Sequence, residues 1–482
     1  MTLPDHKTKI VATIGPASES PEMLERLLRA GLNIARLNFS HGDFTGHAER
    51  IARIRAAEKN TGQRVAIMAD LPGPKMRVGK IEPEPIQLLP GESFTLTSED
   101  VVGNQHRVSM SFARLPLVVK PGDRLFLNDG LVQLVVERVA GNDVQCRVAV
   151  GGELRSRKGL NLPGIDLGIS AFTDHDRACL EFALKNGVDA VSQSFAETAA
   201  DVHAVRAAAK AVGKEPFVIA KIERSDALTH FDEILDAADG IMVARGDLGV
   251  EVPIEQIAVI QKQLVARASR VGKPIIIATQ MLESMTASRL PTRAESTDVA
   301  NAILDGTDCI MLSGESAMGK YPEEAVAMLA KIAACAEAHR AAARPDEFLA
   351  GRRPARPTTA AEAIAEVVEH ALDTVPCAAV FVPTRTGTTA RMISRFKPRV
   401  WTVAVSGSAD VCQGLAFSYG VHAIHMSDEP EAWRDFARNW LCDHHVTGRL
   451  AILVAGPSPR QPDADYRIEF LRIGDKQSPP DS

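Results

Sequence analysis

Charged and hydroxyl-bearing residues stand where apolar segments of this chain end. Lys221 and Glu223 close the segment FVIAKIE, Asp247 follows GIMVAR, Thr279 follows PIIIA, and Arg36 lies in LNIARLN. A pair of acids such as Glu223 and Asp247 suits a hard divalent cation such as Mg²⁺, which prefers oxygen ligands. Arg36 and Lys221 would then face a substrate with more negative charge than the metal neutralises. Phosphate together with carboxylate fits that description, and phosphoryl transfer depends mainly on positioning and charge stabilisation.

Eight β-branched segments would bring these residues together. The segments alternate with stretches of helical period and occupy 8–14, 32–38, 64–70, 189–194, 217–223, 240–245, 274–280 and 308–313. Continuous apolar runs between helices are typical of a buried parallel sheet, and eight of them favour a (β/α)₈ TIM barrel. No GxGxxG follows any run, which disfavours a dinucleotide-binding sheet. Active sites of such barrels gather at the C-terminal strand ends, so Asn38, Ser40 and Asp70 are expected at the same rim.

The remaining sequence predicts two further domains, in line with about 150 residues per domain for a chain of 482. Residues 72–164 change to period-2 segments punctuated by Pro-Gly and Asn-Asp-Gly turns, which indicates a β domain inserted into the barrel. A Pro/Arg/Ala-rich stretch at 341–359 predicts a linker, and helix and strand alternate again after it. We therefore expect a barrel from 1–71 and 165–345 and a C-terminal α/β domain from 346–482, with a disordered polar tail.

Composition excludes several classes of protein. The net charge of −6 provides no basic field for nucleic acid or anionic membrane, and no apolar run is long enough to cross a bilayer. The N-terminus MTLPDHKTKI has no apolar signal region. The seven cysteines form no CxxC pair, which indicates reduced core thiols and a cytoplasmic protein.

Eight sequence motifs, in order along the chain, resemble the pyruvate kinase family. They are IARLNFSHG, DLPGPKMR, KGLNLPG, AKIER, MVARGDLGVE, ATQMLESM, PTRAE and LSGESAMGKYP. The resemblance covers nearly the whole chain and is weakest in its last 30 residues. It implies that the inserted domain is a mobile β-barrel lid and that the C-terminal domain is regulatory. It also implies transfer of the phosphoryl group of phosphoenolpyruvate to ADP, which gives pyruvate and ATP in the last step of glycolysis.

The resemblance assigns roles to the rim residues. Lys221 would stabilise the phosphoryl group in flight, and Glu223 and Asp247 would hold Mg²⁺, with Mn²⁺ as an alternative. Arg36 would bind the substrate phosphate. The backbone around Gly246 and Asp247 and the Thr279 hydroxyl would bind its carboxylate, and a proton donor is required beside Thr279. Arg77 and Lys158, at the hinges of the inserted domain, would contact the nucleotide phosphates.

A monovalent-cation site is also implied, formed by Asn38, Ser40, Asp70 and the carbonyl of Leu71. Many potassium-dependent members of the family read GPEIR where this chain reads GPKMR, which places Lys75 where they carry glutamate. A tethered ammonium would supply the positive charge that K⁺ otherwise provides. We therefore hypothesise that K⁺ is dispensable here; the alternative is that Lys75 simply points to solvent.

The C-terminal domain contains a polar loop between a predicted strand and helix, made of Thr384, Arg385, Thr386, Gly387, Thr388 and Thr389. Free amides, hydroxyls and an arginine at such a junction form a phosphate nest, although an ordinary polar loop is the simpler alternative. The resemblance favours an allosteric, phosphorylated effector there. The family's Gly-rich loop ending in Thr-Asn is replaced by AGPSPRQPDADYR, so a response to fructose bisphosphate does not follow. A homotetramer is expected from the resemblance alone.

Two other functions compete with the kinase. A pyruvate-forming aldolase or lyase would also use a divalent metal or a Schiff-base lysine, but Arg77 and Lys158 argue against it. A metabolite sensor that has lost catalysis is disfavoured because every residue that the reaction needs is present. Gly314-xxxx-Gly319-Lys320 is close to a P-loop, but Tyr321 replaces the hydroxyl that would bind Mg²⁺, so we interpret it as a turn.

Overall fold

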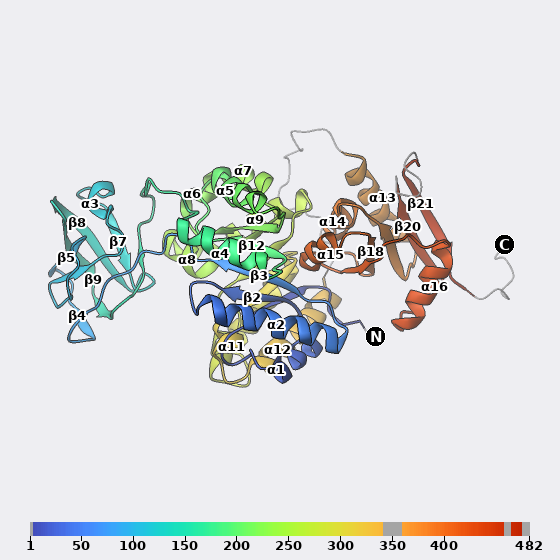
Figure 1. Cartoon of the computed structure of the whole chain (residues 1–482), viewed down its shortest axis with the longest axis horizontal. Helices are drawn as coiled ribbons and strands as arrows, with labels where there is room; N and C mark the ends of the chain where they lie inside the picture. The colour runs from blue at the N-terminus through green and yellow to red at the C-terminus, as the bar shows by residue number, and fades with distance from the viewer. Residues whose placement is uncertain (1–2, 341–358, 457–463, 475–482) are drawn as a thin grey trace.

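The computed structural model describes residues 3–340, 359–456 and 464–474. It consists of three bodies in a row (Figure 1): a β domain at one end, a barrel in the middle and an α/β domain at the other end. The predicted linker at 341–359 and the predicted tail lie almost entirely outside the described residues. Within those residues, no helix is both long and apolar enough to span a membrane.

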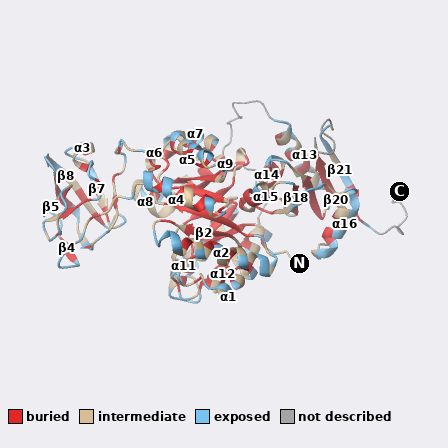
Figure 2. Ribbon diagram, viewed as in Figure 1, coloured by how far each residue is buried: buried red, intermediate tan, exposed pale blue. Residues whose placement is uncertain are grey.

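The central body is a closed barrel of eight parallel strands, one from each predicted segment. Around the barrel the strands follow the order β1-β16-β15-β14-β13-β12-β3-β2. They are β1 (Lys9–Thr13), β2 (Leu32–Asn38), β3 (Ala66–Leu71), β12 (Ala190–Gln193), β13 (Phe217–Ile222), β14 (Gly240–Ala244), β15 (Ile275–Ala278) and β16 (Cys309–Leu312). Their residues are almost all buried (Figure 2). Helices cover the outside of the barrel and side chains fill its inside.

Helices and short turns connect these strands, and local capping signals fix several of their ends. Ser20 caps α1 and Pro21 begins it, while Gly31 ends it in the left-handed conformation at φ 116°. Thr292 and Glu295 form a capping box at the start of α10. The helical elements of the barrel are α1 (Pro21–Ala30), α2 (Phe44–Thr61), α4 (Asp174–Lys185), α5 (Ala199–Ala211), α6 (Ser225–Thr229), α7 (Phe231–Ala237), α8 (Arg245–Glu251), η1 (Ile254–Gln256), α9 (Ile257–Arg270), η2 (Glu283–Thr286), α10 (Arg293–Leu304), α11 (Gly314–Ala317) and α12 (Pro322–Ala338).

The inserted body is a β domain with its own apolar core, as the alternating segments predicted. A six-stranded mixed sheet of order β11-β7-β8-β9-β5-β6 accompanies a two-stranded sheet of β10 and β4. Phe94, Leu125 and Leu134 are fully buried in its core. Its elements are β4 (Ile86–Leu88), β5 (Ser93–Thr97), β6 (Arg107–Ser109), α3 (Leu115–Val118), β7 (Arg124–Leu127), β8 (Val132–Ala140), β9 (Asp143–Val150), β10 (Gly152–Leu154) and β11 (Leu160–Asn161).

The C-terminal body is a five-stranded sheet flanked by helices, in the order β19-β18-β17-β20-β21. The first four strands are parallel and β21 is antiparallel to β20. Its elements are α13 (Ala360–Thr374), β17 (Ala379–Pro383), α14 (Thr388–Ser394), β18 (Trp401–Ser406), α15 (Ala409–Gly414), η3 (Leu415–Phe417), β19 (Val421–His425), α16 (Trp433–Asp443), β20 (Leu450–Ala455) and β21 (Arg467–Arg472). The apolar segments AAVFVPT, VWTVAVS and RLAILVA predict β17, β18 and β20, whereas no segment predicted β19 or β21.

The C-terminal body closes the N-terminal mouth of the barrel. Phe417 is fully buried and its ring stacks on that of Phe217 with centroids 5.1 Å apart. It belongs to the cluster of side chains that fills the inside of the barrel, which also contains Met242 and Met311. Beside it, a buried ion pair joins Lys397 Nζ to Asp308 Oδ1 at 2.6 Å. The barrel interior is therefore a continuous apolar column that begins in the C-terminal body.

Candidate active site

The C-terminal ends of the barrel strands surround a cavity of about 210 Å³ that most of the predicted site residues line. These are Arg36, Asn38, Ser40, Asp70, Lys75, Lys221, Glu223, Asp247 and Thr279. The top of the apolar column, including Met242, Ala278 and Met311, lines the same cavity. The structure therefore brings the predicted rim residues into one cavity, with an apolar floor and charged walls.

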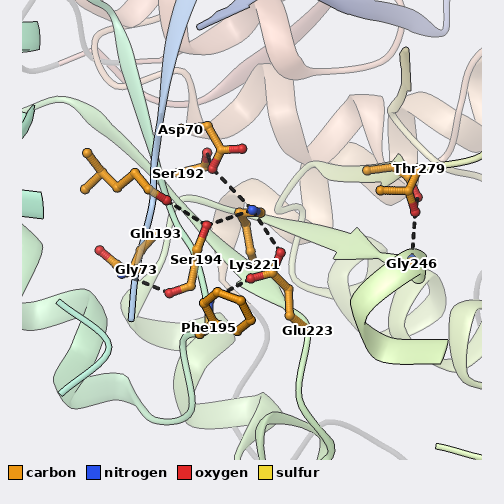
Figure 3. A network of polar contacts seen from close by, with 12 residues as sticks. Asp70, Gly73, Ser192, Gln193, Ser194, Phe195, Lys221, Glu223, Gly246 and Thr279 are labelled. Atoms are coloured by element: carbon orange, nitrogen blue, oxygen red, sulfur yellow. Dashed lines mark hydrogen bonds and ion pairs between the residues drawn. The ribbon is translucent and has the colours of Figure 1, made fainter. Parts of the chain in front are cut away.

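Lys221 lies at the centre of a network of hydrogen bonds and ion pairs between residues at this rim (Figure 3). Its ammonium is 2.8 Å from Glu223 Oε1, 3.3 Å from Asp70 Oδ1 and donates to Ser194 Oγ at 2.8 Å. The residue is only 8% exposed. Burial lowers the pKa of Lys221, but the negative charges of Asp70 and Glu223 outweigh it, so the pKa is raised above its ordinary value. Lys221 is accordingly a cation in the folded protein.

Asp70, at the end of β3, joins Lys221 to Arg36. Arg36 Nε and Nη2 both donate to Asp70 Oδ2, at 2.8 and 2.5 Å, and Nη1 donates to Thr13 Oγ1 at 2.7 Å. Ser192 Oγ donates to the other oxygen of Asp70 at 2.8 Å. Burial raises the pKa of Asp70, but the positive charges of Lys221 and Arg36 outweigh burial and lower it to about 2.

Two serines of this network were not among the predicted site residues. Ser192 lies in β12 and Ser194 directly follows the strand. Ser194 Oγ donates to the carbonyl of Leu71 at 2.7 Å while it accepts from Lys221. The Leu71 carbonyl, expected to bind a monovalent cation, already accepts this hydrogen bond. The i, i+2 spacing of two serines at the end of an apolar segment was the signal available in the sequence.

Glu223 and Asp247 are the carboxylates that could hold a divalent cation. Glu223 Oε2 accepts from the backbone N–H of Phe195 at 2.7 Å, and the residue is 2% exposed. Burial raises the pKa of Glu223; the charge of Lys221 opposes this and that of Asp247 adds to it. The described residues contain no cluster of three or more His, Cys, Asp or Glu with metal-binding geometry. Two carboxylates nevertheless fit Mg²⁺, which usually keeps waters and takes its remaining ligands from substrate phosphates.

Thr279 follows β15 in an unusual backbone conformation. Its φ is 70° and that of Gln280 is 54°, a left-handed region that a β-branched residue such as threonine rarely enters. Its hydroxyl accepts from the backbone N–H of Gly246 at 2.8 Å and donates to the carbonyl of Ala278 at 2.6 Å. The predicted partners Gly246 and Thr279 are thus in direct contact.

The hinge residues Arg77 and Lys158 lie in a second cavity, which adjoins the first. Lys75, Phe195 and Asp247 line both cavities. The backbones of the two hinges run antiparallel, and Arg77 Nη1 donates to the carbonyl of Arg157 at 2.9 Å. The two cavities together extend from the barrel rim to the base of the inserted domain.

The predicted effector loop lies in the C-terminal body, away from the barrel rim. Thr384 Oγ1 accepts from the N–H of Gly387 at 2.9 Å, and the hydroxyls of Thr386 and Thr388 are 2.9 Å apart. Gly387 has φ 80°, which explains the glycine at this turn. Arg385 is exposed and Thr389 is half-buried at the start of α14.

The segment that resembles a P-loop is held by backbone hydrogen bonds. Gly314 begins the short helix α11, and the N–H of Gly319 donates to the carbonyl of Gly314 at 2.9 Å. Lys320 N–H donates to the carbonyl of Thr286 at 2.9 Å. These bonds fold the segment into a turn beside η2, which agrees with its interpretation as a turn from the sequence.

Comparisons with family models, with related sequences and with solved structures all match this chain to pyruvate kinases. The family model "Pyruvate kinase, barrel domain" matches residues 5–326 and "Pyruvate kinase, alpha/beta domain" matches 362–463. A pyruvate kinase of Thermococcus litoralis is 49% identical over 430 residues, covering 89% of this chain and 90% of the relative. The human pyruvate kinase PKLR is 43% identical, covering 89% of this chain and 77% of its own length. The crystal structure of a pyruvate kinase from Cryptosporidium parvum superposes with a TM-score of 0.90 at 35% identity, covering 98% of this chain and 97% of the other.

The Asp70 network predicts a specific acid sensitivity. Asp70 has a folded-state pKa of about 2 against an ordinary value of 3.8, so its ionised form stabilises the fold above that ordinary value. This stabilisation is lost as the pH falls through the folded pKa. We expect Asp70→Asn to be less stable than wild type near neutrality and the difference to shrink by about 2 kcal/mol towards pH ~2.

Urea titrations followed by circular dichroism across this pH range would measure the effect. Asp428→Asn, at an exposed position of the C-terminal body, is the control. A difference between wild type and Asp70→Asn that stays constant with pH would contradict the prediction.

Proposed function

Because this chain belongs to the pyruvate kinase family, we propose that the cavity at its barrel rim is where phosphoenolpyruvate reacts with ADP. The enzyme transfers the phosphoryl group of phosphoenolpyruvate to ADP and forms pyruvate and ATP. The observation that carries the site assignment is the Lys221 ammonium, held between Asp70 and Glu223 in a cavity that Arg36 and Thr279 also line. The remaining assignments follow from this placement.

Lys221 stabilises the phosphoryl group as it moves between the two oxygens that exchange it. The ammonium is fixed by three partners before substrate arrives, so little reorganisation is needed when negative charge develops. The raised pKa of Lys221 keeps it protonated, and a protonated amine cannot attack a carbonyl. This supports the kinase assignment over a Schiff-base aldolase.

Arg36, Gly246 and Thr279 position the substrate. Arg36, fixed by Asp70 and Thr13, presents positive charge to the substrate phosphate. The Gly246 N–H and the Thr279 hydroxyl, now bonded to each other, would turn to the carboxylate. After transfer, the enolate left behind needs a proton, and we expect a proton donor beside the Thr279 hydroxyl, which lines the cavity.

Glu223 and Asp247 would hold Mg²⁺, or Mn²⁺ in its place. When bound, the cation neutralises phosphate charge and orients the phosphates for transfer. Arg77 and Lys158 contact the nucleotide phosphates, since their cavity adjoins the rim and carries positive charge. We expect the enzyme to act in the cytoplasm as a homotetramer; its free cysteines suit a reducing compartment, and sedimentation equilibrium would decide the subunit number.

Replacing Lys221 by methionine tests the assignment. Since its charge acts on the transition state more than on the bound substrate, we expect Lys221→Met to lower kcat by roughly two to three orders of magnitude. Binding of phosphoenolpyruvate should be largely retained. Coupled assays of ATP formation and equilibrium binding give the two quantities, with exposed Lys185→Met as control. Equal losses of binding and turnover would remove Lys221 from this role.

The presence of Lys75 beside the expected monovalent-cation site leads to a prediction about whether activity requires K⁺. Lys75 lines the cavity together with Asn38, Ser40 and Asp70 and is exposed, so its long side chain can bring an ammonium to this site and supply the charge of K⁺. We expect full activity in buffers free of potassium and ammonium, and K⁺ dependence only in Lys75→Glu. Assays of both proteins with and without K⁺ are the measurement. A wild type that is inactive without K⁺ would refute the idea.

The loop at 384–389 is proposed to bind a phosphorylated effector. Its exposed Arg385 and hydroxyls suit phosphate, and its distance from the rim means that it can act only by shifting a conformational equilibrium. We expect Arg385→Ala to abolish activation by phosphorylated metabolites while the rate at saturating phosphoenolpyruvate is unchanged. Loss of that maximal rate with activation intact would identify the loop as structural.

A further inference from the structure

Arg245 and Asp298 form an ion pair beside Thr279 that the proposed function does not use. Arg245 begins α8, directly after β14, and Asp298 lies in α10. Arg245 Nη1 donates to both carboxylate oxygens of Asp298, at 2.8 and 2.7 Å. Its other terminal nitrogen donates to the backbone carbonyl of Thr279 at 2.9 Å. The guanidinium side chain is only 10% exposed, so its direction is fixed.

The residue that this pair holds is strained. Thr279 and Gln280 are consecutive non-glycine residues with φ 70° and 54°. A left-handed backbone lowers the population of such a residue by roughly fivefold to thirtyfold. Strain of this kind persists only where surrounding contacts over-determine it, and it concentrates at functional sites. The bond from Arg245 to the Thr279 carbonyl is one such contact, and it acts on the backbone of the strained turn.

A second contact ties the segment that follows this turn to the same helix. Glu295, which caps α10, accepts from the N–H of Ser284 at 2.7 Å and from its hydroxyl at 2.5 Å. The segment after β15 is therefore attached to α10 at both ends, by Asp298 through Arg245 and by Glu295 directly. Rotation of Thr279 towards negative φ would break the Arg245 bond and displace the hydroxyl from the N–H of Gly246.

We propose that Arg245 and Asp298 are positioning residues that hold Thr279 in its left-handed conformation and so keep its hydroxyl in the cavity. The proposal rests on the assignment of Thr279 to the substrate site. It predicts that the geometry of the pair matters, beyond its charge. Lysine in place of Arg245 retains the charge but cannot bind Asp298 with one nitrogen and the Thr279 carbonyl with another in a fixed plane.

The experiment compares Asp298→Asn and Arg245→Lys with wild type, using kcat/KM for phosphoenolpyruvate in the Mg²⁺-loaded enzyme. We expect both variants to lose roughly 10- to 100-fold, because small misplacements of a substrate-contacting group have effects of that size. Thermal unfolding followed by circular dichroism identifies any variant that has failed to fold.

Rescue by glycine separates positioning from general damage. Glycine enters the left-handed region without strain, so Gln280→Gly removes the strain at the second residue of the turn and makes the left-handed turn at Thr279 easier to keep. In the Asp298→Asn background it should therefore recover roughly fivefold or more of the loss. Gln280→Ala, which keeps the strain, should recover nothing. Wild-type activity in Asp298→Asn, or equal rescue by glycine and alanine, would overturn the proposal.

A crystal structure of Asp298→Asn reports on positioning without reference to activity. We expect the φ of Thr279 to leave the left-handed region, and an unchanged φ would refute the proposal. Thr279→Ala tests the assignment on which it rests. If Thr279→Ala retains full activity, the role of Thr279 in the substrate site is wrong, while the φ of Thr279 in Asp298→Asn still decides whether the pair holds the turn.

Discussion

An ammonium group buried at the mouth of a barrel must be neutralised where it lies, and much of this site follows from that requirement. Lys221 is compensated by Asp70 and Glu223, and Asp70 in turn compensates Arg36. Removing one member leaves an opposite charge buried without its partner, which is strongly destabilising. The same arrangement readies the site for chemistry, because its positive charges are fixed before a polyanionic substrate arrives. Stability and catalysis therefore depend on the same contacts.

The parallel barrel makes this arrangement possible. Its strands end at one rim, so residues far apart in sequence meet there: Asp70 belongs to β3, Ser192 to β12 and Lys221 to β13. Beneath them the interior is apolar down to Phe417, which excludes water from below and strengthens the interactions of the charges above. The site is thus a polar layer on an apolar column, and the C-terminal body supplies the lower end of that column.

The sequence predicted the barrel well because each of its strands is a continuous buried run, and it predicted most rim residues because such runs end at the rim. It did not predict β19, in which three of five residues are only partly buried, or β21, an edge strand in which one residue of six is buried. The ion pair of Arg245 with Asp298 joins residues whose proximity depends on the packing of α10, and the left-handed turn at Thr279 involves no glycine. Neither feature has a local signal in the sequence.

The pairing of β1 with β16 affects how the chain can fold as it is synthesised. The first strand, Lys9–Thr13, keeps one edge without its native partner until Cys309–Leu312 has left the ribosome. The inserted domain has its own core and can fold in the meantime, whereas the barrel around it remains an open sheet. Even after closure, Lys9 Nζ lacks the Val421 carbonyl to which it donates at 2.8 Å in the finished protein. Strand β1 is therefore completed only by β16 and the C-terminal body, both made much later, so the nascent chain carries the unpaired edge of β1 until they have been synthesised.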